Sequence, residues 1–259
     1  GDTKHVLLFP SNPTECFDFA IEGFDLSERL QTPIIVMSDL DLGMNEWTTD
    51  PFKIDETKGF DRGKVLNAEQ LDEIERFGRY LDVDGDGIPY RTYPGTHPEK
   101  GAFFTRGTSH DEYAGYTEDG TINARVMRRL THKFNTAKSL VPAPEFGQEG
   151  QNSTMGLIHF GTTAISVPEA MEMLGDRQIH LDTMRIRAFP FSKEVEDFIN
   201  SHDKVFVVEQ NRDAQMRSLL VNECGLDPAR LVPILNFDGS PITARTIADM
   251  ISEQLGQSK

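Results

Sequence analysis

Short apolar segments alternate with longer amphipathic ones in the second half of the chain, and this alternation constrains the fold most strongly. The pattern predicts strands at 155–160, 179–188, 204–209 and 231–236, and helices at 167–174, 193–201, 214–224 and 243–255. Such alternation is typical of a doubly wound α/β sheet, whose parallel strands are buried on both faces. We therefore predict a doubly wound domain at 146–259, which begins with a polar linker or turn at 147–152.

The first forty residues predict one strand–helix–strand unit. Apolar residues 5–10 indicate a buried strand, and capping side chains at 11–15 precede a helix whose apolar spacing continues to about residue 30. The β-branched run 32–39 predicts a second strand that is covered on both faces. A right-handed parallel unit is the expected topology. Because the chain opens with Gly1 rather than methionine, we expect it to be a fragment.

Between residues 40 and 144 the sequence is polar and rich in glycine and proline. Helical spacing predicts helices at about 68–80 and 124–139, and residues 82–116 predict a long loop between them. Long irregular loops inside globular proteins are usually functional or mobile. The prolines in 141–144 mark a boundary before the last domain.

Charge and cysteine content exclude several kinds of protein. The net charge is −16, from 42 acidic and 26 basic side chains, so nucleic acid and anionic lipid would be repelled. No apolar run reaches the 18 residues of a membrane span, and no signal peptide is recognisable, so we expect a cytoplasmic protein. Cys16 and Cys224 are too few for a disulfide framework or an iron–sulfur cluster, so any cluster is expected in a partner.

An acidic run at 82–87 resembles the start of an EF-hand calcium loop, with carboxylates at alternate positions and glycine at the sixth. The twelfth position is Tyr93 instead of glutamate, and Pro89 interrupts the ligand series. A turn capped by its own carboxylates is therefore favoured over a calcium site, and we predict no metal ligands in this chain.

The segment 101–113 places a guanidinium, an imidazole and two carboxylates between glycines. Arg106 is suited to holding a carboxylate, His110 is suited to proton transfer, and Asp111 or Glu112 could orient either of them. The alternative is a surface loop whose charges satisfy one another, and composition does not separate the two.

Other polar residues follow predicted strands. Glu209 and Asn211 end a buried strand, where open α/β folds place their sites, although they could equally face a neighbouring subunit. The Gly161-Thr162-Thr163 turn lacks the full dinucleotide fingerprint and predicts a tight turn. His159 and His180 lie in or beside strands, where core histidines are commoner than metal ligands.

Several segments, in order, resemble the α subunit of 2-oxoacid:ferredoxin oxidoreductases, particularly the 2-oxoglutarate type. The resemblance covers nearly the whole chain and rests on the segments 5–10, 15–17, 20–29, 31–45, 101–107, 110–113, 116–119, 189–191 and 207–211. It implies that the chain is the C-terminal part of such a subunit. It also implies three segments: the end of a pyrimidine-binding domain at 1–48, a loop-rich connection at 49–145, and a domain like the transketolase C-terminal domain at 146–259.

The resemblance further implies thiamine-dependent oxidative decarboxylation of a 2-oxoacid, with coenzyme A as co-substrate and ferredoxin as electron acceptor, reversible as reductive carboxylation that fixes CO2. Thiamine diphosphate, Mg²⁺ and a [4Fe–4S] cluster would be bound mainly by missing segments or by the β subunit, in a dimer of heterodimers. The fragment alone is then inactive. Residues 92–111 become a candidate active-site cover, with His110 and Asp111 as catalytic candidates and Thr105 and Arg106 as substrate-binding candidates.

Two alternatives stay open. One is a non-catalytic α/β scaffold or interaction module, and the other is a non-redox thiamine enzyme such as a transketolase-like carboligase. A partner with a cysteine set and a diphosphate motif would favour the oxidoreductase, whereas a self-contained chain with neither would favour the scaffold.

Overall fold

The structure, a computed structural model, describes residues 4–147 and 153–256. By spatial contact the chain divides into two compact units, each assembled from separate segments. Unit 1 contains Gly1–Val6, Glu22–Ile34 and Ile54–Val141, and unit 2 contains Leu7–Ile21, Ile35–Lys53 and Pro142–Lys259. The division into consecutive segments at 1–48, 49–145 and 146–259 stays a prediction about domains. Of the linker predicted at 147–152, residues 148–152 lie outside the described part.

Unit 2 contains a five-stranded sheet that confirms the predicted α/β fold class. Its order is β3-β5-β4-β7-β8, and all strands except β3 are parallel. The strands are β3 (Glu145–Phe146), β4 (Met155–His159), β5 (Asp182–Arg185), β7 (Lys204–Glu209) and β8 (Leu231–Leu235). The chain turns from β5 back across β4 to β7, so the sheet is doubly wound, with its switch point between β4 and β7.

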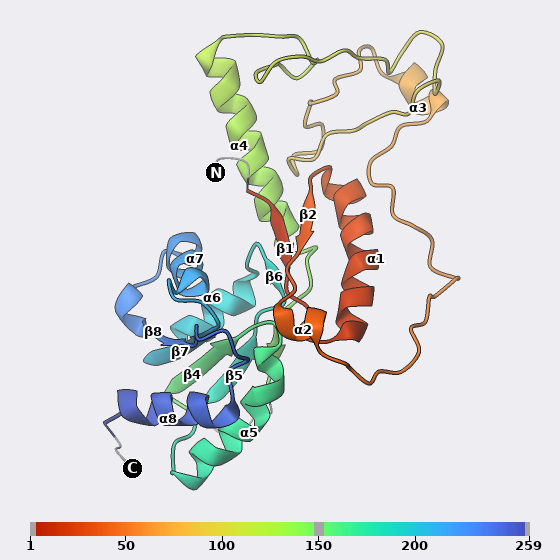
Figure 1. The fold of residues 1–259 in the computed structure, drawn as a ribbon. Coiled ribbons are helices and arrows are strands. Elements are labelled where there is room, and N and C mark those ends of the chain that lie inside the picture. The colour runs from red at the N-terminus through yellow and green to blue at the C-terminus, as the bar shows by residue number, and fades with distance from the viewer. Residues whose placement is uncertain (1–3, 148–152, 257–259) are drawn as a thin grey trace. The chain divides into compact units, whose positions relative to one another are not determined.

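Helices cover both faces of this sheet, as Figure 1 shows: α5 and α8 on one face, α6 and α7 on the other. They are α5 (Thr163–Asp176), α6 (Lys193–Asn200), α7 (Gln215–Cys224) and α8 (Ala244–Gln254), and a 3-10 turn, η1 (Pro228–Arg230), precedes β8. Successive residues of β7 enter opposite cores: Val205 and Val207 pack towards α6 and α7, and Phe206 and Val208 towards α5 and α8. Continuous apolar strands therefore bury side chains on both faces.

The strand predicted at 179–188 is instead two strands in two sheets. β5 ends at Arg185, and β6 (Ala188–Phe189) pairs antiparallel with β1 (Val6–Leu8) in a smaller sheet of order β2-β1-β6. Where the chain passes between the two sheets, the main-chain N–H of Phe9 bonds to the carbonyl of Arg187. Such pairing between distant segments leaves no local sequence signal.

The predicted strand–helix–strand order of the first forty residues is present, as β1, α1 (Pro13–Leu30) and β2 (Ile34–Val36). The expected burial of the second strand is wrong, because Ile35 and Val36 are 41% and 40% exposed. A short helix that the sequence did not indicate, α2 (Leu40–Met44), follows, with Asp39 as its N-cap.

Unit 1 holds the two helices predicted for the central region, with different bounds. α3 (Ala68–Glu73) begins with a capping box between Asn67 and Gln70, but it ends seven residues early because Ile74 is extended. α4 (Gly120–Ala137) begins four residues early, where Asp119 caps it. Between them the chain is irregular, as predicted (Figure 1). None of the helices in the described ranges is both long and apolar enough to span a bilayer.

Candidate functional site

The loop at 101–119 in unit 1 is held in shape by Asp111. Its carboxylate accepts hydrogen bonds from the main-chain N–H groups of Tyr113 at 2.9 Å and Gly115 at 2.8 Å. Its own N–H donates to the Gly115 carbonyl, and His110 pairs with Tyr116 in an isolated bridge. Asp111 is thus placed as a loop-forming residue, a role that its position in the sequence did not reveal.

The other predicted site residues lie on the same loop. His110 stacks on the ring of Tyr80, with centroids 3.9 Å apart, and its Nδ1 lies 3.3 Å from the carbonyl of Asp111. Arg106 is exposed, and its guanidinium lies 5.6 Å from the centre of the Tyr116 ring; Thr105 is also exposed. Arg106 and His110 therefore both contact Tyr116, whereas Asp111 is bonded to Tyr113 and Gly115. Among the described residues, no hydrogen bond joins the side chains of His110 and Asp111.

The charges of this loop are partly satisfied, as the surface-loop alternative expects. Glu112 forms an ion pair with Arg125 of α4 at 2.6 Å. The hydroxyl of Tyr116 donates to Glu118 at 2.6 Å. Arg106 contributes no ion pair in the described ranges, so it retains donors for an anion.

The side chain of Lys64 forms ion pairs with the acidic run at 82–87. Lys64 Nζ lies 2.6 Å from Asp84 and 2.7 Å from Asp86, and Asp82 accepts from the N–H groups of Gly85 and Gly87. The three carboxylates lie close enough to share an ion. The ammonium group of Lys64 pairs with two of them, Asp84 and Asp86, which sequence spacing within the loop could not show. The hydrogen bonds that Asp82 accepts within the loop fit the predicted carboxylate-capped turn.

The carboxyl edge of the unit 2 sheet carries a pocket of about 510 Å³ near the switch point. Glu209 ends β7 as predicted, but it is fully buried and accepts from the N–H groups of Met216 at 2.7 Å and Arg217 at 2.8 Å. It therefore caps α7. Asn211 donates to Glu209 at 2.8 Å and accepts from the N–H of Gln215 at 3.2 Å, so both side chains stabilise the start of α7.

The tight turn predicted at Gly161 is confirmed, with φ at +60°. Asp39 reaches across to it and accepts from Thr162 N–H at 3.3 Å and from Thr162 Oγ1 at 2.6 Å. A carboxylate of the chain itself thus sits at the start of α5, where a phosphate would otherwise bind.

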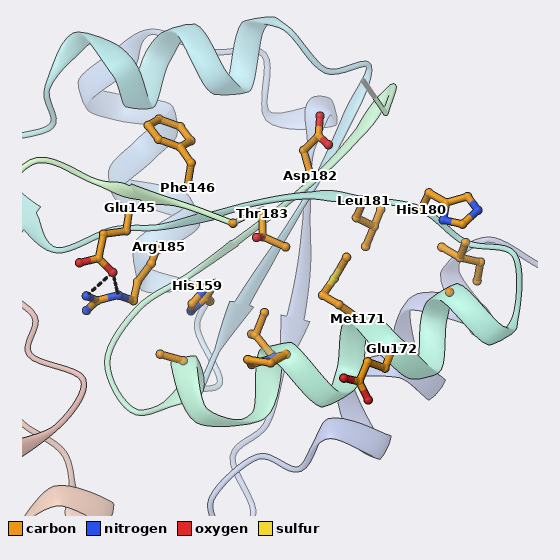
Figure 2. Close-up of a pocket in the computed structure, with 16 residues that line it drawn as sticks. Glu145, Phe146, His159, Met171, Glu172, His180, Leu181, Asp182, Thr183 and Arg185 are labelled. Carbon is orange, nitrogen blue, oxygen red and sulfur yellow. Dashed lines mark hydrogen bonds and ion pairs between the residues drawn. The ribbon is translucent and has the colours of Figure 1, made fainter. Parts of the chain in front are cut away.

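A second cavity, of about 720 Å³, lies between α5 and the β4–β5 edge, as Figure 2 shows. His159 on its wall is 7% exposed, and its Nδ1 has no hydrogen-bond partner in the described structure. Burial, with the nearby charge of Arg185, lowers the pKa of His159 to about 3, so the ring is neutral. His159 is a core histidine as predicted, whereas the same expectation for His180 is wrong, because that residue is exposed.

Four charged residues form a cluster beside this cavity. Arg185 donates two hydrogen bonds to Glu15, at 2.7 and 2.8 Å, and contacts Glu145 at 2.6 Å; Arg187 also donates to Glu15 at 3.0 Å. Burial raises the pKa of Glu15, but hydrogen bonds from Arg185 and Ser11 and the charge of Arg185 lower it further, to about 2. The sequence analysis missed this cluster, and its only local signal is the pair of arginines two residues apart, at the end of β5 and just after it.

Comparison with known proteins places these features in context. Residues 1–129 match the family model described as the thiamine diphosphate-binding domain of pyruvate flavodoxin/ferredoxin oxidoreductase. The chain is 28% identical to the α subunit of 2-oxoacid:ferredoxin oxidoreductase 2 from Aeropyrum pernix, over 98% of its own length and 39% of the relative. It is 25% identical to the 2-oxoglutarate synthase subunit KorA of Methanothermobacter marburgensis, over 90% of its length and 60% of the relative.

The chain is similar to the α subunits of 2-oxoacid:ferredoxin oxidoreductases. A solved 2-oxoglutarate:ferredoxin oxidoreductase from Magnetococcus marinus, with 2-oxoglutarate, coenzyme A and succinyl-CoA bound, has the same fold over 98% of the chain. The TM-score is 0.83 at 23% identity, and 43% of that chain is covered. The chain thus spans less than two thirds of the length of each of these three proteins.

One expectation is corrected by the family match. The matched model bears the name of the amino-terminal domain of these oxidoreductases, so the prediction that the chain is the C-terminal part of an α subunit is wrong for residues 1–129. The physical features used for that prediction, a short strand–helix–strand unit followed by a loop-rich region, do not define a position within a longer subunit.

The described residues offer few unengaged groups for the cofactors of such an oxidoreductase. Two cysteines cannot hold a [4Fe–4S] cluster. The buried carboxylates in the described ranges are Glu15, Asp25 and Glu209. Arginines hold Glu15, the N–H of Asp61 bonds to Asp25 at 3.0 Å, and main-chain N–H groups hold Glu209, so none is available to an aminopyrimidine. The acidic run that could attract Mg²⁺ contains Lys64.

Proposed function

We propose that the chain is part of the α subunit of a 2-oxoacid:ferredoxin oxidoreductase. The carrying observation is similarity to such subunits along 98% of the chain, together with a TM-score of 0.83 to a solved oxidoreductase. The reaction is oxidative decarboxylation of a 2-oxoacid to an acyl-coenzyme A, with electron transfer to ferredoxin, and in reverse it fixes CO2.

We further propose 2-oxoglutarate as the substrate. Two of the relatives carry this substrate in their names, the KorA subunit and the enzyme from Magnetococcus marinus. Pyruvate is the competing substrate, since the matched family model is described by pyruvate oxidoreductases.

In the proposed complex, thiamine diphosphate, Mg²⁺ and the [4Fe–4S] cluster are bound by the β subunit and by segments outside this chain. Thiamine stabilises the carbanion that decarboxylation leaves, and the cluster accepts its electrons. A dimer of heterodimers in the cytoplasm, with ferredoxin as acceptor, is the proposed setting.

The loop at 92–111 is proposed to cover the active site. Asp111 keeps the loop in one conformation through its two main-chain hydrogen bonds, and His110 is the candidate for moving a proton. Thr105 and Arg106, both exposed, are the candidates for binding an anionic group of the 2-oxoacid or of coenzyme A. A preshaped loop of this kind excludes water when it closes.

The test is anaerobic reduction of ferredoxin by the full-length subunit, co-purified with the partner subunit encoded beside it. Reduction that depends on coenzyme A and on 2-oxoglutarate, and that is weaker with pyruvate, is the expected result. Absence of reduction with every 2-oxoacid, despite full thiamine and cluster content, would contradict the proposal. An Asp111→Ala variant with unchanged turnover would remove Asp111 from it.

A further inference from the structure

The cavity of about 720 Å³ in unit 2 has an apolar wall and a polar wall. Thr183 and Arg185 of β5, with His159 of β4, line the side of the sheet, and His159 is the register partner of Arg185 (Figure 2). One face of α5 lines the other side, at helical spacing. It consists of Ala164, Val167, Pro168, Met171 and Gly175. A cavity with a large apolar surface and few polar groups is typical of a small-molecule site.

His159 offers this cavity a hydrogen-bonding group that the fold leaves unused. The side chain is buried, and its Nδ1 has no hydrogen-bond partner in the part of the chain that the structure describes. Burial is the main reason why the pKa of the ring is about 3, so the ring is neutral and has one N–H and one lone pair. A buried polar atom without a partner is unfavourable, so a hydrogen bond from a bound molecule would stabilise this ring.

Pro168 leaves a second acceptor, on the wall that α5 forms. It lies inside the helix and has no main-chain N–H, so the carbonyl of Ala164 cannot receive the usual hydrogen bond from the residue four positions later. Ala164 and Pro168 both line the cavity. An N–H or O–H group of a bound molecule would supply the missing donor.

The charges beside the cavity indicate that the bound molecule is neutral. Arg185 is the only arginine or lysine among the described lining residues, and it is held by Glu15 and Glu145. Glu172, on the side of α5, is exposed and adds a negative charge that repels anions. A phosphate or carboxylate would therefore find no unpaired positive charge here, and burying a charge without a partner is costly.

We propose that this cavity binds a neutral small molecule with an apolar body and an N–H or O–H donor. The apolar body packs against α5, and the donor faces the imidazole of His159 and the carbonyl of Ala164. The inference does not depend on the proposed oxidoreductase activity, because all the residues that carry it lie in unit 2 and none belongs to the loop at 92–111.

Indole is the probe, because it is neutral, mainly apolar and has one N–H donor. Calorimetry on the full-length subunit, in complex with its partner, compares the Kd of indole with that of indene, which lacks the N–H, and of indole-3-carboxylate, which adds a negative charge. Indole is expected to bind about tenfold more tightly than indene, since one net hydrogen bond corresponds to about this factor. The carboxylate should bind most weakly. No binding of indole, equal binding of indole and indene, or tighter binding of the anion would overturn the proposal.

Two tryptophan variants locate the binding. Met171→Trp fills the cavity and should abolish the binding of indole. Ile165→Trp places the same ring at a 52% exposed position of the same helix and should leave the Kd unchanged. Unchanged binding in Met171→Trp would contradict the assignment of indole to this cavity.

Two further variants test the hydrogen-bonding groups. His159→Phe keeps a ring but removes its nitrogens, and Pro168→Ala returns an N–H to the carbonyl of Ala164. Each should raise the Kd of indole several-fold and leave that of indene unchanged. Because Pro168 is exposed, Pro168→Ala should fold even if the buried change His159→Phe does not. A Kd of indole that neither variant raises would overturn the proposal.

Discussion

Glu15 is the residue on which the charged cluster of unit 2 depends. It receives hydrogen bonds from Arg185, Arg187 and Ser11 while it is 9% exposed. Its pKa of about 2 lies below the ordinary 4.5, so the folded state binds its proton more weakly than the unfolded chain. Glu15 therefore contributes stability above about pH 4.5, and this contribution is lost as the pH falls towards 2.

Glu15→Gln is expected to lower the free energy of unfolding by about 3 kcal/mol at pH 7, because the variant leaves two arginines with one carboxylate fewer. Urea unfolding between pH 7 and pH 3 measures this, and the difference from wild type should shrink as the pH falls. Glu172→Gln is the control, at an exposed position, and should change little. A difference that stays constant with pH would contradict the assigned pKa.

Lys133 is a buried cation without a carboxylate partner among the described residues. It is 6% exposed, and its ammonium group lies 3.5 Å from the carbonyl of Gln31. Burial, and then the charges of Arg129 and Arg79, lower its pKa to about 8. The unfolded chain thus holds this proton more tightly, so wild-type stability should rise as the pH increases from 8 towards 10.5.

Lys133→Met should stabilise the protein at pH 7 by about 1–2 kcal/mol, because an apolar side chain of similar length replaces an unpaired buried charge. Denaturation at pH 7 and pH 10 tests this. The free energy of unfolding of the wild type should rise between the two pH values, and that of the variant should rise much less. Lys138→Met, at an exposed position near the end of the same helix, is the control. An equal gain in stability in Lys133→Met and Lys138→Met would show that the buried charge of Lys133 does not cause the gain.

At the scale of elements, Asp39 joins α2 to α5. Its Oδ1 accepts from Leu42 N–H at 3.0 Å as the N-cap of α2, while its Oδ2 accepts from Thr162 at the start of α5. One carboxylate thus satisfies the ends of two helices in unit 2, both of which would otherwise leave main-chain N–H groups unpaired.

Asp39→Ala is expected to cost about 1–2 kcal/mol of stability, since it removes a cap and a second helix contact. Amide hydrogen exchange at Leu42 and Thr162 should become faster. This measurement locates the loss at the two helix starts, whereas urea unfolding reports only the stability of the whole protein. Asp41→Ala, also in α2, is the comparison and should leave Thr162 protected. Unchanged exchange at both amides in Asp39→Ala would contradict the shared cap.

The loop at 82–87 resembles a calcium loop, but the ammonium group of Lys64 pairs with two of its carboxylates. Lys64→Met should leave Asp82, Asp84 and Asp86 close together without a positive charge, so the carboxylates repel one another. We expect a lower melting temperature that millimolar Ca²⁺ restores, while Ca²⁺ leaves wild type unchanged. Lys58→Met replaces an exposed lysine of the same unit and serves as the control. It should change neither the melting temperature nor the response to Ca²⁺. A wild-type protein stabilised by Ca²⁺ would argue for a true calcium site.

At the scale of the whole molecule, the shortage of cysteines limits which cofactors the chain could hold by itself. Its two cysteines and its fully engaged buried carboxylates lead to one expectation: the chain expressed alone contains neither iron nor acid-labile sulfide and reduces no acceptor with a 2-oxoacid. Iron and sulfide analysis, with and without the β subunit, measures this. Stoichiometric iron in the isolated chain would contradict the proposed division of labour between subunits.

Much of the fold was predictable because local apolar patterns in the sequence specify its strands and helices. β7 begins and ends where its apolar run does, and α6, α7 and α8 lie within a residue or two of their predicted bounds. Parallel strands buried on both faces require continuous apolar runs, and the helices between them need an apolar face, so each element carries its own signature.

The errors arose where distant segments decide the structure. β6 leaves the main sheet because β1, far away in the sequence, offers it a partner, and α3 stops at Ile74 although helical spacing continues. His180 shows the same effect, since neighbouring strand residues predicted burial and the edge of the fold left it exposed.

The sequence by itself determined the alternation of strands and helices, the acidic charge, the shortage of cysteines and the position of the polar loop. Only the tertiary structure decided that Arg185 would meet Glu15 and that Lys64 would pair with Asp84 and Asp86. The reason is physical: periodicity is set by neighbours along the chain, whereas the pairing of charges depends on which residues folding brings within a few ångströms.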